Sequence, residues 1–192
     1  MSSSSSTARA TSPVLADLVP WVWVRELVLV GTFTVAIAAS SQLAFMTPWS
    51  PAPVTAQTFV VLLGAAALGG VRAGSGAGLY FAAGALGVPW FAATSGITLG
   101  YIAGFVLAAL LVGRLARAGW TSSYRGAVGA MVLGSLAIYA VGAPVLGLIL
   151  GLGPWETLMV AVVPFLIGDA LKVTVAGALL PSVQRYVDRV AD

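Results

Sequence analysis

The chain has 192 residues, of which 59 % are hydrophobic and 8 % are charged, with a mean hydropathy of +1.01. Soluble domains carry about 25 % charged residues, so this composition excludes an ordinary soluble domain and indicates an integral membrane protein. The net charge is +3 and the sequence contains no cysteine or histidine, which excludes disulfides, thiolate metal sites and histidine-based catalysis.

Continuous apolar runs predict an all-α integral membrane protein, because backbone groups in lipid need partners within the same segment. Residues 1–20 are polar and serine-rich, and they lack a signal-peptide pattern. We expect them to form a disordered cytoplasmic leader ahead of a membrane domain at 21–192. About 20 residues cross a bilayer, and the apolar runs predict six transmembrane helices, over 27–45, 57–70, 74–87, 98–115, 127–150 and 155–180.

The basic residues predict how these helices are oriented. The segments expected on the inner side hold all eight arginines: Arg9, Arg25, Arg72, Arg114, Arg117, Arg125, Arg185 and Arg189. The outer loops, at 46–56, 88–97 and 150–156, contain no lysine or arginine. By the positive-inside rule, the N- and C-termini are cytoplasmic.

The outer loops share prolines and aromatic residues. Pro48, Pro51 and Pro53 predict a rigid, non-helical loop, and Trp49, Trp90, Phe91 and Trp155 lie in or beside the outer loops. Loops of this kind could close over a small, partly apolar ligand. They could equally form an aromatic belt at the outer interface.

Two ionisable residues lie inside the last predicted span. Asp169 and Lys172 are three positions apart, so on a helix they share one face. Ionisable groups inside a membrane cost at least a few kcal/mol each and therefore indicate a functional site. The alternatives are a self-neutralising structural pair and a pair whose side chains extend to the membrane–water interface.

A row of small residues lies in the first predicted span. Ala36, Ser40 and Ala44 are four positions apart and would share one helix face, where backbones can approach closely. The row could dock a partner helix or could serve internal packing.

Residues 69–76 resemble a phosphate-binding loop only superficially, because they lack the Gly-Lys-Ser/Thr ending and follow no strand. We expect no cofactor and no metal in this chain, and any ATP would be hydrolysed by another subunit. The predicted spans contain one acid and no histidine, which argues against an enzyme.

Four motifs occur in order along most of the chain. Residues 51–59 read P-A-P-V-T-A-Q-T-F, residues 79–92 contain L-Y and G-V-P-W-F-A, residues 101–105 read Y-I-A-G-F, and residues 164–172 read P-F-L-I-G-D-A-L-K. This set resembles the signatures of the BioY family, the biotin-specific substrate-capture (S) components of energy-coupling-factor (ECF) transporters. The sequence departs from the family pattern before Tyr101, where Ile97 and Leu99 replace a proline and a glycine.

The resemblance implies the ECF S-component fold in the bacterial cytoplasmic membrane. It implies that the protein captures biotin and takes it up with the help of two kinds of partner, a transmembrane T subunit and two cytosolic ATPase subunits. It implies no nucleic-acid partner. The S component is thought to topple in the lipid bilayer, with Ala36, Ser40 and Ala44 as the sliding contact. Some family members lack a dedicated energising module.

The resemblance also implies a ligand site. Asp169 would accept a hydrogen bond from a ureido N–H of biotin, and Lys172 would donate to a carbonyl or balance Asp169. The further contacts would come from polar and aromatic side chains: Thr55, Gln57, Tyr80, Trp90, Phe91 and Tyr101.

Two other functions fit the residues. The chain could be an S component for another vitamin, such as thiamine or riboflavin. It could also be a non-transport membrane protein in which Asp169 and Lys172 only stabilise helix packing.

Overall fold

The computed structural model describes residues 22–89 and 96–191, with side chains left out at residue 184 and residues 186–191. The predicted leader and two predicted site residues, Trp90 and Phe91, lie outside these ranges.

The described residues form a helical protein with one small sheet. The elements in chain order are α1 (Val22–Ser40), β1 (Ala44–Thr47), β2 (Ser50–Thr55), α2 (Gln57–Leu68), α3 (Gly70–Ala85), α4 (Gly96–Arg117), the 3₁₀ turn η2 (Trp120–Ser122), α5 (Tyr124–Leu150), α6 (Pro154–Ala161) and α7 (Val163–Ala191).

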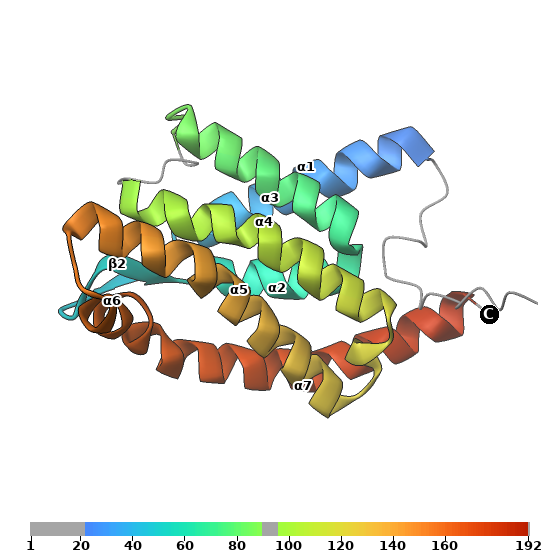
Figure 1. The fold of residues 1–192 in the computed structure, drawn as a ribbon. Coiled ribbons are helices and arrows are strands. Elements are labelled where there is room, and N and C mark those ends of the chain that lie inside the picture. Colours follow the sequence, from blue (N-terminus) through green and yellow to red (C-terminus); the bar gives the residue numbers. More distant parts are fainter. Residues whose placement is uncertain (1–21, 90–95, 192) are drawn as a thin grey trace, which may run out of the picture.

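The helices pack as an elongated bundle (Figure 1). α4 contacts α2, α3 and α5 and so forms its centre, while α1 packs on α3 and α7 packs on α5. In Figure 1, α1 and α3 lie on one side of the bundle and α7 on the other. The antiparallel β1–β2 hairpin lies with α6 at one end, and the chain ends at the other.

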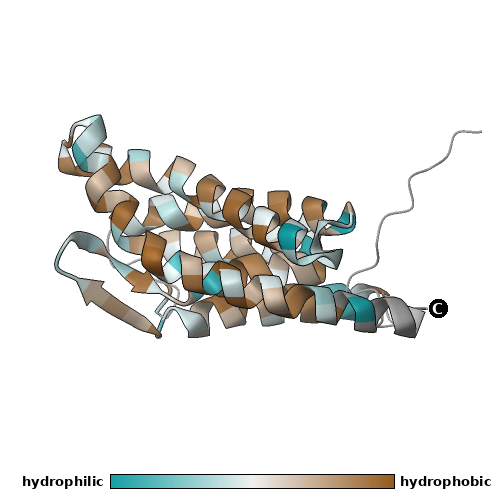
Figure 2. Cartoon of the chain, turned by 90° about the horizontal axis from the view of Figure 1, so that it is seen from below, coloured by the Kyte–Doolittle hydropathy of each residue, from teal (hydrophilic) through white to brown (hydrophobic). Residues whose placement is uncertain are grey.

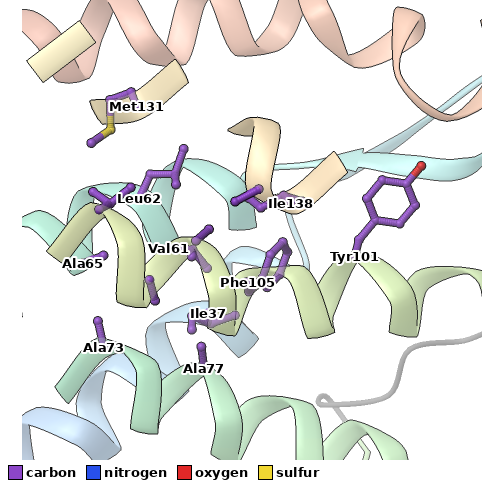
Figure 3. Packing of buried hydrophobic residues seen from close by; sticks show 14 of the residues in the cluster. Ile37, Val61, Leu62, Ala65, Ala73, Ala77, Tyr101, Phe105, Met131 and Ile138 are labelled. Atoms are coloured by element: carbon purple, nitrogen blue, oxygen red, sulfur yellow. The ribbon is translucent and has the colours of Figure 1, made fainter. Parts of the chain in front are cut away.

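Small residues allow this core to be tight. Figure 3 shows Val61, Phe105 and Ile138, from α2, α4 and α5, gathered around the same interior space. A Cβ atom added at Gly104 would lie 2.8 Å from the carbonyl oxygen of Ile138, so α4 and α5 touch through their backbones. Glycine and alanine permit such close approach of membrane helices.

Four described helices are long and apolar enough to cross a membrane: α1, α4, α5 and residues 163–183 of α7. α2 is a shorter apolar helix. Figure 2 shows hydrophobic residues distributed along the lengths of the helices. Large apolar side chains such as Leu148 and Ile167 are more than 80 % exposed, as suits side chains that face lipid.

The predicted boundaries need two corrections at the first span. α1 ends at Ser40 rather than near residue 45, because residues 41–43 turn the chain into β1. The loop predicted as rigid and non-helical is the β1–β2 hairpin, with Ala44 opposite Thr55 and Phe45 opposite Val54.

The predicted span at 155–180 is wrong as a single helix. It consists of α6 and α7, separated at Val162, whose φ of −126° is not helical. Pro164 has no N–H to donate to the carbonyl of residue 160, so a continuous helix would lose a hydrogen bond here.

The close approach of α4 and α5 generates a stability prediction. Gly104→Ala should lower the free energy of unfolding by about 1–3 kcal/mol, because the added methyl group overpacks a backbone contact. Thermal unfolding of the purified protein in detergent measures this change. Gly31→Ala is the matched control, because a Cβ atom there meets no described atom within 4 Å. Equal melting temperatures for the two variants would contradict the packing.

Candidate functional site

Lys172 on α7 joins three segments of the chain. Its Nζ atom donates hydrogen bonds to the backbone oxygen of Thr55 at 3.0 Å, to Oγ1 of Thr58 at 2.6 Å and to Oδ1 of Asp169 at 3.3 Å. An ammonium group has three protons to donate, so each has an acceptor. The prediction that Asp169 and Lys172 share one helix face is confirmed, and the two side chains form an ion pair at 3.3 Å.

Asp169 is held from two sides. Oδ1 faces Lys172, and Oδ2 accepts a hydrogen bond of 2.5 Å from the hydroxyl of Tyr139 on α5. Only 7 % of Asp169 is exposed, so its carboxylate is a buried charge with two partners. A buried charge is tolerated when it is paired and hydrogen-bonded in this way.

A second polar chain lies where the hairpin passes into α2. Oγ1 of Thr55 donates to Oε1 of Gln57 at 3.2 Å, and Nε2 of Gln57 donates to the hydroxyl of Tyr80 at 2.7 Å. Tyr80 is 1 % exposed and does not itself line the cavity that Gln57 lines. Tyr80 therefore orients the Gln57 amide.

The break between α6 and α7 shapes the aromatic wall of the site. In a continuous helix, the N–H of Phe165 would bond to the carbonyl of Ala161, but here it bonds to that of Val162 at 3.0 Å. The carbonyl of Ala161 instead accepts a hydrogen bond of 2.7 Å from the hydroxyl of Tyr101. The rings of Tyr101 and Phe165 lie 5.8 Å apart, an ordinary distance for an aromatic pair.

These side chains enclose a cavity of about 40 Å³ between β2, α2, α4, α5 and α7. Its polar lining includes Thr55, Gln57, Thr58, Tyr139, Asp169 and Lys172, and its apolar lining includes Phe105, Ile138 and Phe165. Sites for small molecules typically measure about 300–1,000 Å³. The space between the described walls is therefore smaller than a typical small-molecule site.

Comparisons with known proteins identify the family. A family model described as "BioY family" matches residues 6–189. The chain belongs to the BioY family.

Two relatives agree with this assignment. The biotin transporter BioY of Thermotoga maritima is 33 % identical over 162 residues, which cover 81 % of this chain and 93 % of that protein. The probable biotin transporter BioY of Methanothermobacter thermautotrophicus is 41 % identical over 116 residues, which cover 53 % of this chain and 74 % of that protein.

A solved structure shows the same fold. It is the crystal structure of the S-component for biotin from an ECF-type ABC transporter, with a TM-score of 0.74 and 20 % identity. The similarity covers 84 % of this chain and 92 % of that one. At this identity the match supports the fold.

Sequence reasoning missed part of the site of this BioY protein. Tyr139 was not predicted as a site residue. A tyrosine hydroxyl in an apolar span needs a hydrogen-bond partner, and this need could have identified Tyr139 as part of a polar site. Thr58 belongs to the motif at residues 51–59 but was not predicted as a site residue, and its hydroxyl accepts a hydrogen bond from Lys172. Ile97 and Leu99, where the sequence departs from the family pattern, lie in the first turn of α4, and Thr98 between them lines the cavity.

The predicted row of small residues is not continuous in this BioY protein. Ala44 lies on β1 rather than on α1, because the helix ends at Ser40. Ser40 is buried, and its hydroxyl donates to the carbonyl of Ile37 at 2.8 Å. Ala36 is half-buried. Of the three, Ser40 therefore serves packing within the chain.

Proposed function

We propose that this protein is the substrate-binding S component of an ECF-type transporter and that it captures biotin for uptake across the cytoplasmic membrane. The observation that carries the proposal is the ion pair between buried Asp169 and half-buried Lys172 on the wall of a cavity. Membership of the BioY family and two relatives named as biotin transporters support the choice of vitamin. The protein is a transport component rather than an enzyme.

The chemistry of the cavity fits the ureido ring of biotin, which offers two N–H donors and one carbonyl acceptor. A carboxylate has about four acceptor positions, so Asp169 can accept from the ligand while Tyr139 still holds Oδ2. The contact between Lys172 and Asp169 is the longest that Lys172 makes, at 3.3 Å. When Lys172 turns toward the ligand carbonyl, the hydrogen bond that it gives up is this longest one, to Asp169.

The other walls fit the rest of the molecule. Phe105, Ile138 and Phe165 present apolar surface to the thioether ring and the aliphatic chain. Gln57 offers both a donor and an acceptor at the start of α2, and the hydroxyl of Tyr80 holds one end of its amide. Trp90 and Phe91, outside the described residues, remain predicted contacts on the outer side.

Titration of the detergent-purified protein with biotin tests the site. Asp169→Asn should weaken binding by about 10-fold to 100-fold, because a hydrogen bond to a buried charged group contributes about 1.5–3 kcal/mol. Glu156→Gln is the matched control, since it makes the same chemical change at an exposed residue outside the cavity. Unchanged affinity in folded Asp169→Asn protein would remove Asp169 from the site.

Two results would favour the other functions. Tighter binding of thiamine or riboflavin than of biotin would make the chain an S component for another vitamin. No binding of any vitamin, with the ion pair intact, would leave Asp169 and Lys172 as a structural pair.

For transport, the proposed arrangement has six membrane segments, α1 to α5 and α6–α7, with both termini in the cytoplasm. The arginines support this orientation, because Arg72, Arg114, Arg117 and Arg125 gather near one end of the described helices. A transmembrane T subunit and two cytosolic ATPase subunits would supply the energy. This chain would contribute neither ATP hydrolysis nor a cofactor.

The partner surface proposed for the T subunit is the outward side of α1, on which Thr32, Val35 and Ala39 are exposed and Ala36 is half-buried. Val35→Trp should abolish most ATP-dependent biotin uptake in cells that express the partners, and it should leave biotin affinity unchanged. Leu136→Trp on the exposed side of α5 is the control. Equal uptake by both variants would place the partner elsewhere.

A further inference from the structure

A larger cavity lies at the opposite end of α2 and α4 from the candidate vitamin site. The first residue of α2, Gln57, lines the vitamin cavity, and its last residue, Leu68, lines this second one. The second cavity measures about 500 Å³, within the range typical of ligand sites. It is formed by the start of α1, the turn between α2 and α3, and the last turns of α4.

A glycine turn builds one wall of this cavity. Gly69 has a φ of +83°, a conformation that favours glycine, and it lets α3 begin directly after α2. The guanidinium of Arg117 lies against this turn, since a Cβ atom on Gly69 would be 2.7 Å from Nε of Arg117. α4 is therefore in direct contact with the turn, and its arginines border the cavity.

The lining carries an excess of positive charge. Among the described residues, Arg72, Arg114 and Arg117 line the cavity together with one acid, Glu26, which gives this part of the lining a formal charge of +2. Arg72 binds Glu26 through two hydrogen bonds, of 2.7 and 2.8 Å. Arg114 is exposed at the rim. Arg114 and Arg117, the other two cations of the described lining, lie in the last turn of α4.

The other lining residues are apolar: Val22, Trp23, Leu68, Val71 and Leu110. Trp23 is 82 % exposed and Val71 is 80 % exposed. Tryptophan favours the headgroup level of a bilayer, so this part of the lining belongs at the membrane surface. An acyl chain would bury apolar surface against these walls, whereas a small soluble anion has no apolar surface to bury.

We propose that this cavity, which we call the arginine cavity, binds the headgroup of an anionic phospholipid of the cytoplasmic leaflet. Arg114 and Arg117 contact the phosphate, and the wall formed by Trp23, Val71 and Leu110 contacts the upper part of an acyl chain. Basic pockets on the cytoplasmic side of membrane proteins suit such headgroups. The proposal uses the membrane orientation given above and does not depend on which vitamin the protein binds.

Native mass spectrometry of the detergent-purified protein, without biotin, tests the proposal. Phosphatidylglycerol and phosphatidylcholine with the same acyl chains are added in separate titrations, and the lipid-bound fraction is measured. Phosphatidylglycerol should bind at least tenfold more tightly. Arg114→Gln together with Arg117→Gln should weaken it by about 25-fold, or about fivefold for each arginine near an anionic lipid.

Two variants sharpen the test. Arg125→Gln removes the same charge at the start of α5, outside the arginine cavity, and should change the affinity for phosphatidylglycerol less than twofold. Glu26→Gln removes the acid from the lining and should tighten binding. Biotin affinity should be the same in the arginine variants as in the unmodified protein, which separates this site from the vitamin site.

Several outcomes would overturn the proposal. Equal binding of the two lipids, or equal losses in Arg125→Gln and the double variant, would reduce the effect to general surface charge. Displacement of the lipid by glycerol phosphate at similar concentration would assign the site to a soluble anion. A double variant that keeps the lipid but loses co-purification with a T subunit would make the cavity a protein interface.

Discussion

The arrangement of the candidate site depends on the hydrogen bonds that the ammonium group of Lys172 donates. Its three hydrogen bonds reach the end of β2, the first turn of α2 and the preceding turn of α7. They connect the hairpin and α2 to α7 at the wall of the cavity. Removing one partner of a buried ion pair leaves the other uncompensated, which is strongly destabilising. The same group is thus a structural tie and, in our proposal, a ligand contact.

The sequence predicted local features well and distant ones poorly. Asp169 and Lys172 could be placed on one helix face in advance, because residues three positions apart on a helix share a face. Tyr139 could not be assigned to Asp169, because the two are 30 positions apart and nothing local relates α5 to α7. The apolar runs in the sequence also extend past the ends of helices, so hydropathy predicted neither the turn after Ser40 nor the break at Val162. Ala44 was placed on a helix for the same reason.

The two ends of the molecule have different chemistry. The candidate vitamin cavity is small, and its polar lining includes the hydrogen-bonded side chains of Tyr139, Asp169 and Lys172. The arginine cavity is larger, and exposed Trp23 lies on its wall. α2 and α4 run between the two cavities, so each helix has one end at the proposed vitamin site and the other at the proposed lipid site.

The most direct test of the central claim is an experimental structure of the protein with biotin bound in a lipid environment. The account predicts the ureido ring within hydrogen-bond distance of Asp169 and Lys172, with Phe165 moved outward and the Tyr139 contact to Asp169 preserved. Biotin bound elsewhere, with the contacts of Lys172 to Thr55, Thr58 and Asp169 unchanged, would contradict it.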